Sequence, residues 1–126
     1  MGAAALSTEA REIESTFDCA TRLHRDGHLV EAERLYRAIV TVQPRHAAAN
    51  HNLGVIYAQS TRAEEALPLF LAAIEADPAE PQYWLSYIDG LLLANRRDDA
   101  RLVLAHAVEH GLRGRSVDAL MQRIGE

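Results

Sequence analysis

The side chains that could carry chemistry in this chain of 126 residues are six histidines and one cysteine. His106 and His110 are four residues apart, a spacing that places two imidazoles on one face of a helix and is typical of zinc sites. Zinc also needs at least one further protein ligand, and no histidine or cysteine lies near this pair in the sequence. His24 and His28 share the spacing, but Gly27 lies between them. We therefore predict that the chain holds no metal ion.

Catalytic motifs are missing from the sequence as well. It contains no Gly-x-Ser-x-Gly turn and no glycine-rich phosphate loop. Cys19 has no base at a plausible spacing and falls among apolar positions, which suits a small packed residue. The acidic pairs Glu64–Glu65 and Asp98–Asp99 lie where helices are expected to begin, and carboxylates there interact favourably with the helix dipole. We predict that the chain is not an enzyme and uses no cofactor.

The composition is that of an ordinary globular domain, with 48% hydrophobic and 25% charged residues. A net charge of -5 argues against nucleic acid as a partner. No apolar run approaches the ~18 residues that cross a bilayer, and the N-terminus lacks the features of a signal peptide. We therefore expect a cytoplasmic protein with no membrane contact. All 13 basic residues are arginine, which resembles the coding bias of a GC-rich bacterial genome.

Helical periodicity organises the elements that would position these residues. From Ser7, a plausible N-cap, apolar residues fall on one helical face as far as Leu23, and the pattern stops before Gly27. A second helix is predicted over 29–42, before Pro44. A step of 34 residues reproduces the same positions twice; these are Ala20, Gly54 and Ile88, then Leu23, Tyr57 and Leu91, then Ala32, Ala66 and Ala100, then Tyr36, Phe70 and Leu104, then Ile39, Ala73 and Ala107.

The clearest copy of the pattern lies in 47–78, which contains N-x-x-L-G-x-x-Y, then A-x-x-x-F-x-x-A, then a closing proline. This stretch resembles one tetratricopeptide repeat, a helix-turn-helix unit of 34 residues. The resemblance implies an all-α, right-handed superhelical array of three repeats with a C-terminal capping helix, about seven helices in a single domain over 1–126. The expected repeats span about 13–46, 47–80 and 81–114, and the capping helix about 116–124.

Two details of the helix junctions follow from this register. Thr61 with Glu64, and Asn95 with Asp98, have the spacing of N-terminal capping pairs for the second helices of repeats two and three. In the third repeat a large residue replaces the small one at the contact between the paired helices. We expect Gly90 to provide the close approach there instead.

In the tetratricopeptide repeat family, the first helices of successive repeats line a concave groove that holds extended peptides or partner helices. The resemblance therefore implies a protein-interaction scaffold whose partner is another protein. Asn52 suits such a groove, because one amide can donate to and accept from a peptide backbone at once. The groove positions carried over from the family are Glu14, Phe17, Asp18, Thr21, His24, Arg25, Ala48, His51, Asn52, Val55, Gln59, Gln82, Leu85, Ser86, Asp89, Leu92 and Leu93.

One family function is excluded by the sequence. Repeats that bind chaperone tails need cations in the groove to neutralise the terminal carboxylate of the ligand. Phe17, Gln82 and Ser86 stand in the places of those cations, and the chain has no lysine. We therefore reject a carboxylate clamp.

The third repeat leaves several alternatives open. Its first helix is apolar almost all round, so Leu85, Leu92 and Leu93 could line an apolar pocket, contact a second copy of the chain or a following domain, or pack internally. The stretch 84–120 also resembles the last repeat before the catalytic domain of bacterial transferases related to O-linked sugar transferases. The alternatives to a scaffold are therefore a targeting domain of such an enzyme and a module for homo-oligomerisation, including a homodimer.

Overall fold

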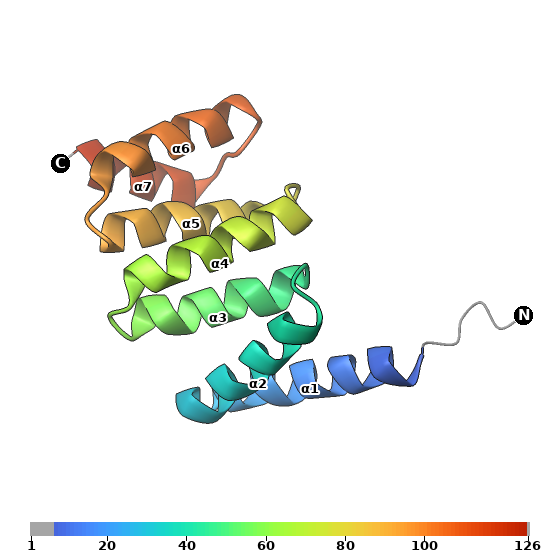
Figure 1. Cartoon of the computed structure of the whole chain (residues 1–126). Coiled ribbons are helices and arrows are strands. Elements are labelled where there is room, and N and C mark those ends of the chain that lie inside the picture. The colour runs from blue at the N-terminus through green and yellow to red at the C-terminus, as the bar shows by residue number, and fades with distance from the viewer. Residues whose placement is uncertain (1–6, 126) are drawn as a thin grey trace, which may run out of the picture.

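The computed structural model describes residues 7–125, which form seven α-helices joined by short turns. The helices stack in chain order, with α1 and α2 at one end of the array and α6 and α7 at the other (Figure 1). This confirms the all-α array of three helix pairs and a terminal helix. No helix in 7–125 is long and apolar enough to cross a membrane. The bounds are α1 Thr8–Arg25, α2 Leu29–Val42, α3 Ala47–Gln59, α4 Ala63–Ala76, α5 Pro81–Leu93, α6 Arg97–Glu109 and α7 Arg115–Gly125.

The helices begin and end for local reasons that the sequence carries. The hydroxyl of Ser7 accepts a hydrogen bond of 3.0 Å from the backbone N–H of Ala10, which confirms Ser7 as the N-cap of α1. Gly27 follows α1 with a φ of +86°, a left-handed conformation that glycine adopts without strain. Pro81 occupies the first turn of α5, where its missing N–H costs nothing.

The two predicted capping pairs are wrong. Thr61 and Asn95 have φ values of 60° and 64°, so each is a left-handed residue that ends the preceding turn. The N-cap positions of α4 and α6 are instead Arg62 and Arg96, and neither side chain caps its own helix. The Arg62 guanidinium donates to Glu33 of α2 at 2.7 Å, so it connects neighbouring helix pairs.

A buried amide holds the turn between α2 and α3. Asn50 is only 4% exposed, and its Nδ2 donates to the backbone carbonyl oxygens of Pro44 at 3.0 Å and His46 at 2.9 Å. The imidazole of His46 accepts from the backbone N–H of Ala49 in the first turn of α3. These contacts satisfy polar groups that would otherwise be buried without partners.

The core divides into two clusters that meet at α4. The first comprises Ile13, Ala20, Ala32, Tyr36, Ile39, Ala49, Leu53, Ile56, Tyr57, Ala66 and Phe70. The second comprises Leu67, Ile88, Leu91, Ala100, Leu104, Val117, Leu120 and Ile124. Because α4 contributes to both, it connects the N-terminal half of the array with the C-terminal half.

The ring of Phe70 lies between two glycines on different helices. A Cβ atom on Gly54 of α3 would lie 2.7 Å from one edge of this ring, and a Cβ on Gly90 of α5 would lie 3.1 Å from the other. Gly90 would also meet Leu67 of α4 at 3.3 Å. The expectation that Gly90 mediates the contact of α5 with its paired helix is therefore wrong, because it faces α4.

The terminal helix α7 covers the end of the second core cluster. Its apolar residues Val117, Leu120 and Ile124 are buried there. Arg97 of α6 donates through Nη1 to the backbone carbonyl oxygens of Arg123 at 2.8 Å and Ile124 at 2.9 Å. This guanidinium satisfies carbonyls that the last turn of a helix leaves free, and its charge suits the helix C-terminus.

Candidate functional site

Three first helices present polar side chains on a common surface. We call this surface the first-helix face and define it as the sides of α1, α3 and α5 that carry Thr21, Asn52 and Ser86. All three residues were predicted to line the groove. Their side chains are half-buried, and hydrogen bonds connect them across the array.

The N-terminal part of this connection passes through a tyrosine of the core. Tyr36 of α2 has no exposed surface, yet its hydroxyl lies 3.3 Å from Thr21 Oγ1 and accepts a hydrogen bond of 3.2 Å from Asn52 Nδ2. The hydroxyl of this buried residue thus connects α1 with α3. Sequence reasoning missed this role, because Tyr36 matches an apolar core position in the repeat.

The C-terminal part of the connection passes through a histidine. His51 lies next to Asn52 on α3, with Nδ1 3.2 Å from Asn52 Oδ1 and Nε2 2.8 Å from the hydroxyl of Ser86 on α5. Gln82, one turn earlier on α5, donates to the same hydroxyl at 3.4 Å. The full hydrogen-bond chain runs through Thr21, Tyr36, Asn52, His51, Ser86 and Gln82.

The chemistry of these groups fixes one proton and makes the other depend on the charge of the ring. The Asn52 amide nitrogen can only donate, so its oxygen accepts from Nδ1–H of His51. In a neutral imidazole Nε2 accepts from the Ser86 hydroxyl, whereas a protonated ring would donate to it. One N–H and one lone pair of the Asn52 amide are used within the chain, which leaves one donor and one acceptor for a ligand.

The surroundings of His51 favour that neutral form. Its ring packs against Tyr83, with centroids 4.9 Å apart, and against Phe70 at 5.7 Å. Burial lowers the pKa of His51, although the hydrogen bond to Asn52 and the charge of Glu80 act in the opposite direction. The hydrogen-bond chain is therefore uncharged along its length at neutral pH.

A hollow of about 300 Å³ opens beside Ser86 and Gln82, where the hydrogen-bond chain ends. Residues of α5 form one wall of this hollow and residues of α7 form the other. Arg123 of α7 donates to Asp89 of α5 at 2.7 Å across it. We call it the α5–α7 hollow; its lining residues are Gln82, Leu85, Ser86, Asp89, Ser116, Ala119, Leu120 and Arg123.

The four α7 residues of this hollow were missed at the sequence level, although a signal for them was present. Each lies 34 positions after one of the predicted groove residues on α5, as Arg123 does after Asp89. The sequence pattern predicts α7 only as a cap for the core. The same helix also extends the first-helix face by one further element.

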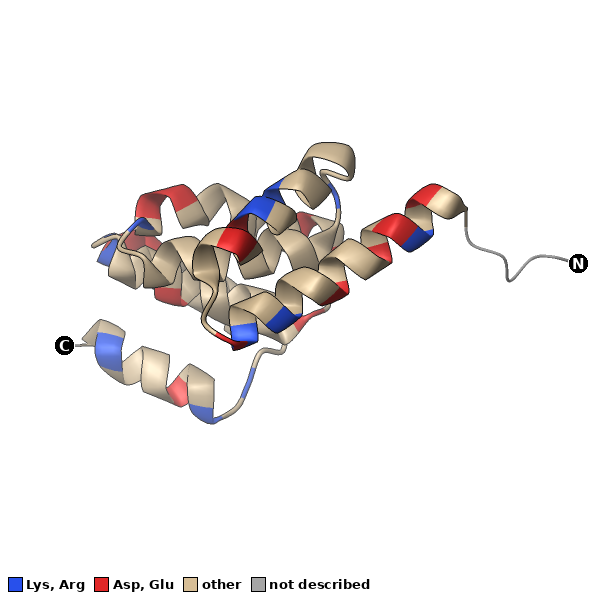
Figure 2. Cartoon of the chain, turned by 90° about the horizontal axis from the view of Figure 1, so that it is seen from below, with Lys and Arg blue, Asp and Glu red and all other residues tan. Residues whose placement is uncertain are grey.

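Other predicted groove residues take no part in the hydrogen-bond chain from Thr21 to Gln82. Asp18, Arg25 and Gln59 are exposed, and acidic and basic residues are interspersed along α1 and α7 (Figure 2). Phe17 packs its ring on Tyr36 and His46, with centroids 5.9 Å and 5.1 Å away. The remaining members differ in burial; Val55 packs on the first core cluster, Leu92 packs on the second, and Leu93 is 53% exposed.

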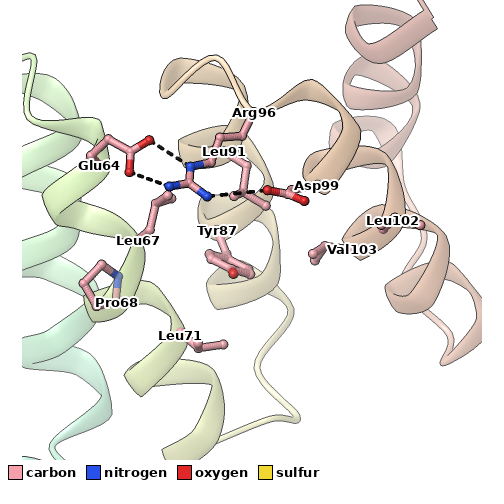
Figure 3. Close-up of a pocket in the computed structure, with 10 residues that line it drawn as sticks. All are labelled: Glu64, Leu67, Pro68, Leu71, Tyr87, Leu91, Arg96, Asp99, Leu102 and Val103. Carbon is pink, nitrogen blue, oxygen red and sulfur yellow. Dashed lines mark hydrogen bonds and ion pairs between the residues drawn. The ribbon is translucent and has the colours of Figure 1, made fainter.

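A second hollow, of about 450 Å³, lies between the second helices α4 and α6, where Tyr87 of α5 projects between them (Figure 3). On one side of it, Arg96 donates through Nε and Nη2 to the two carboxylate oxygens of Glu64, each at 2.8 Å. These bonds hold the pKa of Glu64 below its usual range. Tyr87 and Ser86 project from different sides of α5, so this hollow and the α5–α7 hollow lie on different faces.

The histidine pair on α6 packs with the single tryptophan. The rings of His106 and His110 lie 4.3 Å apart, and His106 also packs on Trp84 at 5.8 Å. Nδ1 of His110 donates to the backbone carbonyl oxygen of His106. Within 7–125, no group of three or more histidine, cysteine, aspartate or glutamate side chains is placed to hold a metal ion.

Solved structures share the fold. The second tetratricopeptide repeat (TPR) domain of human RPAP3, in complex with an HSP70 peptide, superimposes with a TM-score of 0.84 at 14% identity, covering 93% of this chain and 98% of that chain. The Yersinia enterocolitica type III secretion chaperone SycD, in complex with a peptide of the translocator YopD, gives 0.76 at 17% identity, covering 94% and 89%. An O-GlcNAc transferase of Thermobaculum terrenum gives 0.74 at 23% identity; the match covers 83% of this chain but 20% of the transferase.

Sequence comparison adds the family to the fold. No curated protein sequence shows significant similarity to the chain. A model of the tetratricopeptide repeat family matches residues 23–87, which is more than half of the chain. The observed array of helix pairs agrees with this match. The chain therefore belongs to the tetratricopeptide repeat family.

Proposed function

We propose that the chain is a protein-interaction scaffold that binds an extended segment of a partner protein along the first-helix face. The observation that carries this proposal is the uncharged hydrogen-bond chain from Thr21 to Gln82. It holds polar side chains of α1, α3 and α5 in fixed orientations. Side chains that are held before binding lose little conformational entropy when a ligand arrives.

Asn52 is the central contact in this proposal. Its amide is oriented by Tyr36 and His51 and keeps one donor and one acceptor free. A peptide backbone offers the complementary pair at every residue, so this amide recognises an extended chain whatever its side chains are. Two similar structures, of RPAP3 and SycD, were solved with peptides bound, which supports a peptide as the ligand class.

The two alternatives stay predictions. A targeting domain within a transferase agrees with the shared fold of the Thermobaculum terrenum enzyme, in which the matching part is a fifth of the chain. Homo-oligomerisation would use exposed apolar residues such as Leu93. Sedimentation of the chain at high concentration tests the second alternative, because a monomer at all concentrations contradicts it.

Selection from a phage-displayed library of random 12-residue peptides tests the scaffold proposal. We expect the immobilised full chain to enrich peptides that bind Asn52→Ala at least about tenfold more weakly, which corresponds to the loss of one or two hydrogen bonds. Gln43→Ala is the matched control, because it removes an exposed amide at the end of α2. Failure to enrich peptides, or equal binding to Asn52→Ala, would contradict the proposal.

A further inference from the structure

We propose that the α5–α7 hollow binds one apolar side chain of the partner segment, of leucine or methionine size, and that the Asp89–Arg123 ion pair selects uncharged residues next to this anchor. The inference rests on the proposed function, since it names the kind of segment that the first-helix face accepts. It assigns α7 a part in specificity that a capping helix does not need.

The size and lining of the hollow suit an apolar side chain. Its volume of about 300 Å³ is at the lower end of the range for ligand pockets and leaves room for one leucine or methionine side chain. Leu85, Ala119 and Leu120 supply its apolar surface, and Leu120 itself is buried. Pockets that take individual side chains are a common source of specificity where a protein binds the backbone of an extended peptide.

The position of the hollow connects it to the backbone-binding part of the face. Ser86 and Gln82 both belong to the hydrogen-bond chain and both line the hollow. A partner segment that is bound at Asn52 and runs along the hydrogen-bond chain toward α5 therefore reaches the α5–α7 hollow. The anchor and the backbone contact belong to one continuous binding site.

Charge decides which residues suit the positions next to the anchor. Asp89 and Arg123 are the charged members of the described lining, and they neutralise each other at 2.7 Å. A ligand carboxylate that approached Arg123 would meet Asp89 beside it, and a ligand ammonium group near Asp89 would meet Arg123. A charged neighbour would thus lose hydration without gaining an unopposed counter-charge. Uncharged neighbours avoid this cost.

Breaking the ion pair from either side should change the selected charge in opposite directions. Asp89→Asn leaves the guanidinium of Arg123 without its carboxylate, so acidic residues should appear next to the anchor. Arg123→Gln leaves Asp89 without its guanidinium, so lysine or arginine should appear there. Both side chains are roughly half exposed, so neither substitution buries an unpaired charge.

The experiment uses the same random 12-residue phage library on the full chain, Asp89→Asn and Arg123→Gln. We expect a leucine, isoleucine, methionine or valine at one fixed position for all three, with uncharged, acidic and basic neighbours respectively. Peptides enriched on the unchanged chain should bind Ala119→Trp at least tenfold more weakly, because the indole fills the hollow. They should bind Ala105→Trp normally, since Ala105 is an exposed alanine of α6 outside the hollow.

The outcomes separate this inference from the proposed function. Peptides that depend on Asn52 but bind Ala119→Trp equally well would overturn the anchor and leave the scaffold proposal standing. The same neighbours for all three chains would overturn the role of the ion pair. A library that yields no Asn52-dependent peptide would overturn both. Thermal melting of each variant confirms that it is folded before binding is compared.

Discussion

Nε2 of His51 lies 2.8 Å from the hydroxyl oxygen of Ser86, and this contact joins the first helices of the second and third helix pairs. It places a titratable ring inside a hydrogen-bond chain whose other side chains are uncharged at neutral pH. Because the ring also contacts Asn52, the protonation of one histidine affects the part of the face that we assign to peptide binding.

The stability of the array should depend on pH through this histidine. Burial lowers the pKa of His51 in the folded state, whereas an unfolded histidine titrates near ~6.5. The unfolded chain therefore binds more protons between these two values. The contribution of His51 to the free energy of unfolding is complete above pH ~6.5 and is lost as the pH falls through the pKa of His51 in the folded state.

Urea unfolding at pH 7.5 and 5.5 measures this contribution. We expect His51→Gln to lose less stability than the unchanged chain over this interval. His28→Gln, which alters an exposed histidine, should retain the full pH dependence. If His51→Gln and the unchanged chain lost the same free energy of unfolding between pH 7.5 and 5.5, another group would be the cause of the pH dependence.

Two glycine substitutions should differ although both contact one ring. Gly54→Ala places a methyl group 2.7 Å from Phe70, whose other edge lies against Gly90, so the ring cannot move away. We expect a loss of about 1–3 kcal/mol in the free energy of unfolding, despite a gain of ~1 kcal/mol in helix propensity. A Cβ atom on Gly90 would lie 3.1 Å from the Phe70 ring, so Gly90→Ala should lower the free energy of unfolding by less. Urea titration ranks the two, and a smaller cost for Gly54→Ala would contradict this packing.

The buried amide of Asn50 should be required for its hydrogen bonds and not for its volume. Asn50→Leu leaves the carbonyl oxygens of Pro44 and His46 without this donor, so we expect a loss of about 1–3 kcal/mol. Asn50→Asp should cost at least as much, because a carboxylate cannot donate. Circular dichroism during urea unfolding measures both. A neutral Asn50→Leu would mean that water replaces the amide.

The terminal helix should stabilise the C-terminal half of the array. Leu120 is 5% exposed, so Leu120→Ala should cost about 2–5 kcal/mol. Deleting 115–126 should lower the melting temperature by removing three buried side chains from the second core cluster. The substitution Met121→Ala is a useful control, since that side chain is 46% exposed. An unchanged melting temperature after the deletion would contradict the capping role.

Much of the fold could be predicted from the sequence because the repeat constrains it strongly. The predicted second helix has the bounds of α2, and the residues at the repeated positions are buried except Leu23, which is partly buried against the first core cluster. The capping pairs failed because Thr61 and Asn95 stand between two helices. A residue there can cap the next helix or end the previous one. The left-handed backbone conformation of Thr61 and Asn95 shows that each ends the previous helix.

The candidate site was predicted only in its first-helix positions. The bond from Asn52 to Tyr36 depends on a hydroxyl that reaches across from α2, and periodicity gives no information about the end of a buried side chain. The contribution of α7 was accessible, because one more step of 34 residues leads from Asp89 to Arg123. Residues 116–124 show the apolar spacing of a capping helix, and this pattern marks only the buried side of α7.

The division of the core into two clusters that share α4 gives the array an order of opening. Fraying of α1 or α7 removes residues from one cluster and leaves the other assembled, whereas unwinding α4 disrupts both. Backbone amides in α4 should therefore exchange with deuterium most slowly, and those at the two ends of the chain fastest. A partner that spans α1, α3 and α5 would slow exchange most in α1, so exchange rates can report occupancy without any label on the ligand.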